Sequence, residues 1–154
     1  MKRFVTLLVL VTWLLPVASG KDLRPAKGRL LVATELVGGD FFTQTVVLLL
    51  HYDATGAMGI VINRPTEVEP QELLEDVEPI TGYSGPVYWG GPVQMNSLRA
   101  LLRTDTPPSG AEAIVGSVHQ LVIDDALKIA PTDSANLRFF IGYAGWSAVP
   151  LTIQ

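Results

Sequence analysis

The sequence predicts a single α+β domain on two observations. Short segments rich in Val, Ile and Leu, separated by Gly, Pro and Asp, recur along most of the chain, which is typical of strands and turns. One segment after Pro70 instead places Leu73, Leu74 and Val77 on one stripe between acidic residues, which is typical of an amphipathic helix. A chain of 154 residues is long enough for one hydrophobic core, and we assign the domain to residues 21–154.

The first 20 residues have the pattern of a secretory signal peptide. Lys2 and Arg3 form a basic start, Phe4–Val17 is an apolar run, and Ala18-Ser19-Gly20 supplies small residues for cleavage after Gly20. The apolar run is shorter than the ~20 residues that span a bilayer. We therefore expect a secreted or periplasmic protein with no stable membrane anchor after cleavage, and the absence of Cys excludes a lipoprotein.

The charge of the mature chain argues against nucleic-acid binding. Removal of Lys2 and Arg3 from the 11 basic residues leaves nine against 15 acidic residues, a net charge of −6. The phosphate backbone repels such a domain, and no basic stripe or helix-turn-helix pattern is visible. Zero cysteines also exclude a disulfide, a thiolate nucleophile and a Cys-based metal site.

The first half of the domain predicts three strands. Gly28–Thr34 is the first, and a loop with Gly38-Gly39-Asp40 follows, which Phe41 and Phe42 dock onto the core. Thr45–Tyr52 is apolar on both faces and predicts a covered strand. Asp53-Ala54-Thr55-Gly56 has turn chemistry, and Ala57–Asn63 is a third strand with Met58, Ile60 and Ile62 on one face. Pro65 ends this strand because it cannot donate to a ladder.

The second half is more mixed. A helix opens at Glu69-Pro70, because Pro suits the first helical position, and Pro86–Trp89 is a short strand. The periodicity of Asn96–Thr104 fits either a strand or a helix. His119–Ile123 predicts a strand, Asp124–Ile129 a short helix, and Leu137–Tyr143 a strand that ends at Ala144-Gly145-Trp146.

Several blocks of the sequence carry a family resemblance. They are Gly28–Thr34, Asp40–Phe42, Thr45–Leu48, His51, GAMGIVINRPT at 56–66, Gly90–Val93 and GYAGW at 142–146 with Ile141 before it. In this order they resemble the YqgE/AlgH family of bacterial proteins. The resemblance implies a branched, mostly antiparallel sheet with a small barrel-like portion, flanked by helices, and favours a strand at Asn96–Thr104.

The resemblance leaves the function open. Members of the family are often labelled transcriptional regulators, and the residues of this chain do not support DNA binding. Typical members look cytoplasmic, so the signal peptide is a departure. The family usually continues beyond its Trp with a helix and a last strand, whereas here eight residues follow Trp146. We therefore expect a C-terminus shortened relative to the family.

Asn63-Arg64-Pro65-Thr66 is the best candidate for a binding site. Arg64 offers a fork of donors that suits carboxylates and phosphates. In this interpretation the amide of Asn63 orients the anion, and the hydroxyl of Thr66 assists in holding it. The alternative is structural: Asn63 and Thr66 tie down the turn, and Arg64 pairs with Asp40 or a Glu of the helix.

Other candidate residues also have two interpretations. Gly90 and Gly91 either let backbone approach a ligand or form a tight turn. Tyr143 and Trp146 either line a groove or are core aromatics beside glycines that make room for them. His51 is either a base or ligand, or a core or edge histidine bonded to backbone.

Standard enzyme motifs are absent from the sequence. There is no Gly-Lys-Ser/Thr phosphate loop and no H-E-x-x-H motif. Residues 82–86 do not match the nucleophile elbow G-x-S-x-G, because Pro86 stands where the motif requires Gly. Asp124-Asp125 is adjacent in sequence and fits a surface or helix start better than a metal site. We expect no cofactor and no metal. The first hypothesis is a non-catalytic binding or regulatory domain with a protein partner; the alternative is an enzyme or small-anion-binding protein that uses residues 63–66 and Gly90-Gly91.

Overall fold

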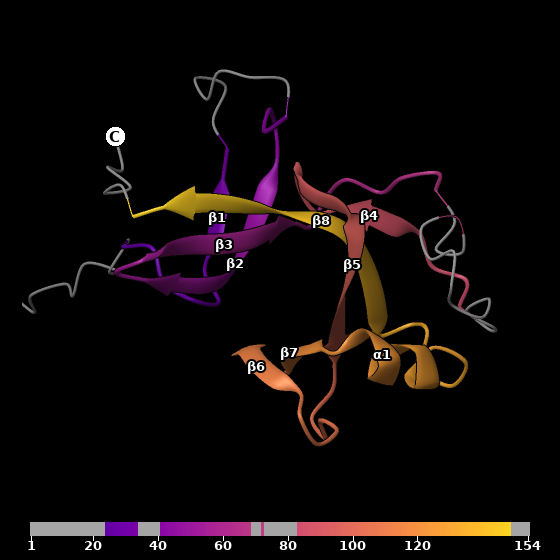
Figure 1. The fold of residues 1–154 in the computed structure, drawn as a ribbon. Coiled ribbons are helices and arrows are strands. Elements are labelled where there is room, and N and C mark those ends of the chain that lie inside the picture. The colour runs from indigo at the N-terminus through magenta and orange to yellow at the C-terminus, as the bar shows by residue number, and fades with distance from the viewer. Residues whose placement is uncertain (1–23, 34–40, 69–71, 73–82, 149–154) are drawn as a thin grey trace, which may run out of the picture.

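Two long strands, β5 (Val93–Arg103) and β8 (Leu137–Ser147), form the centre of the fold in the computed structural model (Figure 1). The structure describes residues 24–33, 41–68, 72 and 83–148. The remaining elements, in chain order, are β1 (Leu30–Val32), β2 (Val46–Asp53), β3 (Gly56–Val61), β4 (Val87–Trp89), β6 (Glu112–Val115), β7 (Val118–Leu121) and the helix α1 (Ile123–Ile129).

The strands form one branched sheet in the order β1-β2-β3-β8-β5-β7-β6, with β4 added in parallel to β8. Strand β8 joins the two parts of the sheet: Leu137–Tyr143 pairs with β5, and Ala144–Ser147 pairs with β3. Gly142, with φ of +66°, lies at an irregularity in the β5–β8 register. Such a bulge bends a strand and increases its twist, which lets the sheet curl.

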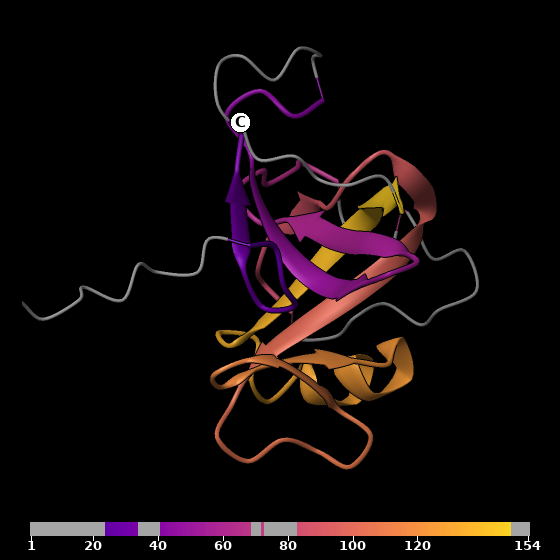
Figure 2. The ribbon, with the colours of Figure 1, turned by 90° about the vertical axis from the view of Figure 1, so that its left-hand side faces the viewer.

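The curl brings the two ends of the sheet together at one point. Figure 2 shows β1, β2 and β3 (indigo to purple) on one side of β5 and β8, and β6 and β7 (orange) on the other. Lys27, just before β1, forms an ion pair with Glu112 of β6. A Cβ on Gly28 would lie 2.6 Å from the carbonyl oxygen of Ile114, so only glycine permits this approach. The sheet is thus a curled half-barrel.

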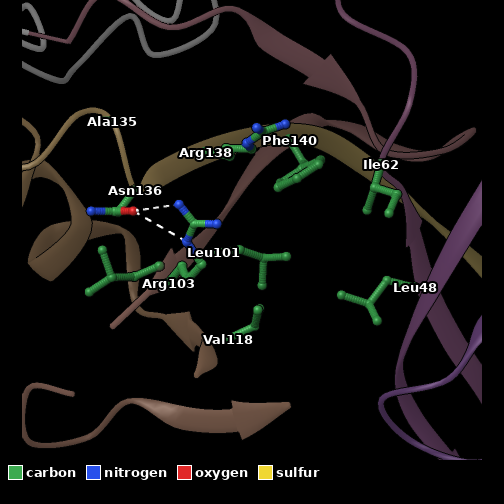
Figure 3. A pocket seen from close by; sticks show the side chains of 10 residues that line it. Leu48, Ile62, Leu101, Arg103, Val118, Ala135, Asn136, Arg138 and Phe140 are labelled. Carbon is green, nitrogen blue, oxygen red and sulfur yellow. Dashed lines mark hydrogen bonds between the residues drawn. The ribbon is translucent and has the colours of Figure 1, made fainter. Parts of the chain in front are cut away.

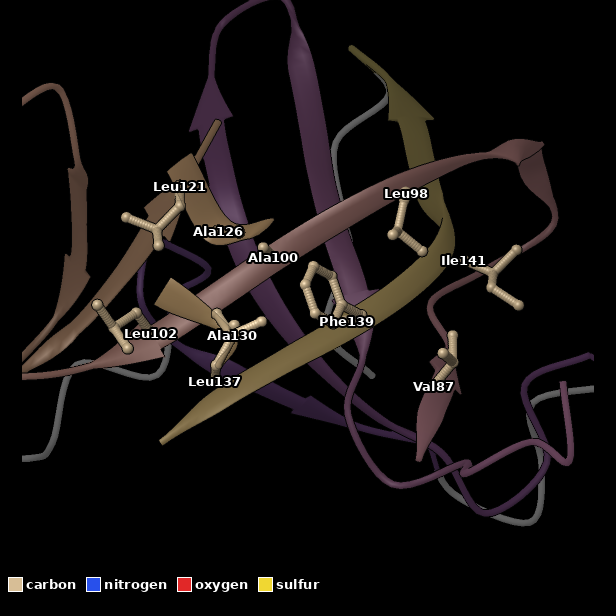
Figure 4. Close-up of a cluster of buried hydrophobic side chains, with 10 residues drawn as sticks. All are labelled: Val87, Leu98, Ala100, Leu102, Leu121, Ala126, Ala130, Leu137, Phe139 and Ile141. Carbon is tan, nitrogen blue, oxygen red and sulfur yellow. The ribbon is translucent and has the colours of Figure 1, made fainter. Parts of the chain in front are cut away.

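The outer face of the half-barrel carries the first hydrophobic cluster, which we call the outer core (Figure 4). Alternate residues of β5 and β8 point to it, and α1 covers it with the buried Ala126. Tyr83 packs edge-on against Phe139 with ring centroids 4.9 Å apart, and burial raises the pKa of this phenol. The outer core consists of Val87, Leu98, Ala100, Leu102, Leu121, Ala126, Ala130, Leu137, Phe139 and Ile141.

The inner face carries a second cluster, the inner core, within the curl. Its members come from strands far apart in sequence: Leu48, Leu50, Ile60, Leu101, Ile114 and Phe140. Leu101 and Phe140 alternate along β5 and β8 with residues of the outer core, so both faces of these strands bury apolar side chains, although the inner face of β5 also carries Arg99 and Arg103. This explains why the Asn96–Thr104 segment shows no clear period: a strand covered on both faces need not alternate.

The prediction of a helix-flanked α+β fold is wrong. Of the described residues, 49% lie in strands and 8% are helical, with α1 the one short helix among them. The physical reason is that the sheet covers much of its own inner face by curling, so it does not need a helix there. The helix predicted from Glu69-Pro70 onward lies outside the described residues except for residue 72, and the predicted signal peptide also lies outside them.

Several local predictions are confirmed. The segments predicted at Thr45–Tyr52 and Ala57–Asn63 form β2 and β3, with Met58 and Ile62 on the inner core beside Ile60. The turn between them is held by Asp53, whose carboxylate accepts from the backbone N–H of Thr55 at 2.7 Å. Val118–Ile129 contains both a strand and a helix, β7 and α1. Strand β6 was not predicted.

Candidate functional site

The Asn63–Thr66 turn holds the loop that precedes β2. The Asn63 side chain accepts from the backbone N–H of Val46 and donates to the carbonyl of Gln44, both at 2.9 Å. The Arg64 guanidinium donates from Nη1 to the carbonyl of Phe41 and from Nη2 to that of Thr43, both at 2.8 Å. Gln44 has a φ of +56°, which costs backbone energy, and these bonds offset that cost.

Aromatic side chains surround the same turn. The Arg64 guanidinium lies 5.3 Å from the centre of the Trp89 ring. Phe41 stacks on Trp89 with centroids 6.2 Å apart, and Phe42 contacts Trp89 and Trp146 at 6.4 and 6.2 Å. Both terminal nitrogens of Arg64 are thus engaged within the chain. The anion-binding role of this turn stays a prediction, and the geometry gives it a structural role.

Gly90 and Gly91 form a close crossing of backbones. Gly90 donates to the carbonyl of Ile141 at 2.7 Å and accepts from Val61 at 2.9 Å. A Cβ on Gly91 would overlap the carbonyl group of Tyr143, and one on Gly142 would overlap the carbonyl oxygen of Gly91. Both Gly90 and Gly91 are buried. These glycines therefore let β4 and β5 pass against β8.

The remaining predicted residues lie apart from one another. Thr66 donates to the carbonyl of Val87 at 2.9 Å. His51 is exposed and its Nε2 lies 2.8 Å from a carboxylate oxygen of Asp53, so it bonds a side chain at the end of β2 rather than backbone. Tyr143 lies on the inner core beneath the guanidinium of Arg99, 4.7 Å from its ring centre. Asp40 lies outside the described residues.

Asp53 is the one described carboxyl with a clearly lowered pKa. Hydrogen bonds from the hydroxyl of Thr55, and then from its backbone N–H, hold the pKa of Asp53 at about 2, below the ordinary 3.8, and His51 adds a smaller effect. Because the group is exposed and its main partner is its own turn, the shift reports turn structure rather than a catalytic site.

A cavity that sequence reasoning missed opens on the inner face of the half-barrel (Figure 3). Its volume is about 270 Å³. Apolar side chains from both parts of the sheet line it, and its polar lining comes from Arg103, Asn136 and Arg138. We call it the barrel cavity; its lining is Leu48, Ile62, Leu101, Leu102, Arg103, Val118, Ala135, Asn136, Arg138 and Phe140.

The pairing of β5 with β8 places the two guanidiniums at the cavity. Arg103 lies two residues from Leu101, which faces Arg138 across the ladder. Arg103 donates from Nε and Nη2 to the side-chain amide oxygen Oδ1 of Asn136 at 3.3 and 3.1 Å. Arg138 donates from Nη1 to the hydroxyl of Tyr88 at 3.0 Å and lies over that ring. Both arginines therefore have uncharged partners.

The alternation of Arg99, Leu101 and Arg103 was the signal available in the sequence. In a strand these residues share one face, but the segment was not assigned by periodicity, and Arg138 is 35 positions further along the chain.

None of the described helices is long and apolar enough to cross a membrane.

Comparisons with known proteins agree on one family. The model of the family described as AlgH-like (DUF179) matches residues 30–152. A UPF0301 protein of Streptomyces coelicolor is 40% identical over 126 residues, and one of Streptomyces avermitilis 35% over 125 residues. Each alignment covers 77% of this chain and 65% of the relative, so the chain spans less than two thirds of the length of these relatives.

Two solved structures have a similar fold. The solution structure of AlgH from Pseudomonas aeruginosa has a TM-score of 0.64 and 28% identity, covering 83% of this chain and 72% of that one. A crystal structure of a Corynebacterium diphtheriae protein has a TM-score of 0.68 over 83% of this chain and 70% of that one. At 19% identity the second match concerns the fold alone.

Proposed function

The chain belongs to the AlgH-like family, as its motifs predicted, and on that premise we propose that it is a non-catalytic binding domain whose ligand occupies the barrel cavity. The family itself is of uncharacterised function. The observation that carries the proposal is the cavity lining, in which apolar side chains from two distant parts of the sheet meet two arginines with uncharged partners.

The polar lining favours binding over acid–base catalysis. Among the described residues, the polar side chains at the cavity are two guanidiniums and one carboxamide. A guanidinium stays protonated at physiological pH and a carboxamide does not titrate there. These groups hold and orient a ligand well, but they do not move a proton as a general acid or base does.

A ligand screen with a turnover control tests the proposal. The full chain is melted alone and with each member of a panel of small molecules, and each stabilising compound is then recovered and analysed by mass spectrometry. A ligand at a hundredfold excess over its Kd stabilises by ~2.7 kcal/mol. We expect stabilising compounds to be recovered unchanged.

Two matched substitutions locate the binding. Ile62→Phe fills the cavity, whereas Val122→Phe adds the same ring at a site that is 62% exposed. We expect the stabilisation to vanish only in the Ile62→Phe variant. Conversion of a compound to a product, abolished by Arg103→Gln, would instead favour the enzymatic alternative.

We further propose that the chain is exported, on the strength of the Met1–Gly20 pattern. Fractionation of cells that express the full chain with a C-terminal tag tests this. The expected periplasmic or secreted form has the intact mass of a chain that begins at Lys21, and a cytoplasmic form that retains Met1 would contradict the proposal.

A protein partner stays a prediction from sequence. We expect no DNA binding in a gel-shift assay at physiological ionic strength, because the acidic chain repels phosphates.

A further inference from the structure

We propose that the barrel cavity binds a small organic oxyanion, a carboxylate or phosphate group on a short apolar body. This inference rests on the proposed binding function and names its ligand class. It follows from three features of the cavity: its uncompensated positive charge, its apolar wall and its volume.

Three arginines share the inner face of β5 and β8. Arg99 and Arg103 flank Leu101 along β5, and Arg138 faces Leu101 on the neighbouring strand. Arg103 and Arg138 line the cavity, whereas Arg99 lies beside it over the Tyr143 ring. Arg103 and Arg138 are exposed and Arg99 is half-buried, so water screens part of the repulsion among these three like charges.

No carboxylate neutralises this face among residues 24–33, 41–68, 72 and 83–148. The ion pairs in that part of the chain lie elsewhere: Lys27 with Glu112, His51 with Asp53 and Lys128 with Asp125. The partners of Arg103 and Arg138 are an amide and a phenol, and the buried Nε of Arg99 has no hydrogen-bond partner. An oxyanion is the ligand that complements such a face.

The guanidiniums retain donors for a ligand. Arg103 uses Nε and Nη2 for Asn136, which leaves Nη1, and Arg138 uses Nη1 for Tyr88, which leaves Nε and Nη2. Asn136 and Tyr88 also hold the two side chains in place, which reduces the entropy lost on binding. The Nε/Nη2 fork of Arg138 and the Nη1 group of Arg103 together suit carboxylate or phosphate oxygens.

The opposite wall of the cavity is apolar. Figure 3 shows Leu48 and Ile62 across the cavity from Arg103 and Asn136, with Phe140 and Leu101 between them. Leu101 and Phe140 are only 8% and 1% exposed. A ligand that carries its charge at one end and an apolar group at the other satisfies both walls, whereas a bare inorganic anion leaves the apolar wall uncovered.

The volume limits the size of this ligand. A water molecule occupies ~30 Å³ of the liquid, so 270 Å³ corresponds to roughly nine waters, or about nine non-hydrogen atoms. Hexanoate, with about eight non-hydrogen atoms, and hexyl phosphate, with about eleven, bracket this size and have this chemistry. A ligand this small is expected to bind with a Kd between about 1 µM and 1 mM.

Titrations followed by amide NMR spectra test the inference on the full chain. The probes are hexanoate, hexyl phosphate and hexanamide, the last being an uncharged match for hexanoate. We expect the two anions to shift signals of cavity residues and hexanamide to bind at least tenfold more weakly. The ratio of the two anion affinities tells whether the site prefers a carboxylate or a phosphate.

Charge variants with a matched control identify the groups involved. Arg103→Gln and Arg138→Gln are each expected to weaken anion binding at least tenfold, whereas Lys128→Gln, which removes an exposed charge on α1, leaves it unchanged. The same spectra report whether each variant is folded, and Arg103→Lys, which keeps the charge and loses the fork, provides a second variant.

Distinct outcomes separate this inference from the proposed function. Equal affinity for hexanamide, with shifts at the cavity, overturns the anion assignment and keeps the cavity as a binding site. An equal loss of affinity in Lys128→Gln, or shifts confined to other surfaces, also overturns it. If no probe shifts a cavity signal, the proposed oxyanion ligand is wrong. The broader ligand screen with the Ile62→Phe variant then decides whether the cavity binds any ligand.

Discussion

Removal of the Arg64 guanidinium tests whether the Asn63–Thr66 turn is structural. In the Arg64→Ala variant two hydrogen bonds to the carbonyls of Phe41 and Thr43 are lost, together with the contact over Trp89. Because water can reach both carbonyls, each bond contributes about 0.5–1 kcal/mol, at the lower end for such bonds. The cation–π contact adds about 0.5–1 kcal/mol.

The sum is a loss of about 2 kcal/mol of unfolding free energy, which corresponds to a fall in Tm of about 4–8 °C for a chain of this size. Urea denaturation followed by tryptophan fluorescence measures it, and Trp89 reports directly on the altered contact. We expect Arg64→Lys to recover less than half of the loss, because one ammonium group cannot serve two carbonyls in a fixed fork.

Two results would refute this reasoning. One is an Arg64→Ala variant whose unfolding free energy falls by less than about 0.5 kcal/mol, the size of an ordinary surface substitution. The other is a variant of unchanged stability that no longer binds hexanoate, which would restore the turn as the anion site. The structure favours the opposite pattern: lower stability with unchanged hexanoate binding at the barrel cavity.

Three further predictions concern the fold. Gly142→Ala forces a side chain onto a backbone with φ of +66° and onto a carbonyl oxygen, so the unfolding free energy should fall by at least about 3 kcal/mol in urea denaturation. Phe139→Ala removes a fully buried ring from the outer core and should cost about 3–5 kcal/mol in the same assay. Asp53→Asn should reduce the change in unfolding free energy between pH 4 and pH 2. With a folded-state pKa of about 2, the ionised Asp53 carboxylate stabilises the fold above pH 3.8, and this stabilisation is lost as the pH falls from about 4 to 2.

Matched controls accompany these changes. Gly110→Ala has φ of +85° with open space around the added Cβ, so it should cost only about 1–2 kcal/mol; an equal loss at Gly142 would disprove the overlap. Val122→Ala, at an exposed site, should stay within about 0.5 kcal/mol, and a Phe139→Ala loss of that size would contradict its place in the core. Urea midpoints at pH 5 and pH 2 that change equally with and without Asp53 would rule out its contribution.

Local chemistry made part of the fold predictable. Strands β2 and β3 and their turn follow from β-branched and apolar runs around an Asp-Ala-Thr-Gly sequence, in which every cue lies within a few residues. The division of Val118–Ile129 into β7 and α1 is similar. The motifs at residues 56–66 and 142–146 also identified the family, because each motif is a short continuous block of sequence.

Other features depend on contacts between distant residues. The sequence predicted Asn63 and Arg64 as candidate binding residues because they are polar groups at a strand end. Their actual partners are backbone carbonyls of the loop before β2, which only the folded structure brings close to them. The helix-flanked fold was wrong because the composition of single strands does not reveal that the sheet curls onto its own inner face.

The sequence by itself determined β2, β3 and the turn between them, and which side chains of a strand share a face, because backbone dihedrals and side-chain alternation are set by near neighbours. Only the tertiary structure decided which faces meet. Arg103 and Arg138 become one site because β5 pairs with β8 in a particular register, and Leu48 and Ile62 face them because a bend near Gly142 curls the sheet. Pairing and curvature depend on burial across the whole molecule, which no short segment contains.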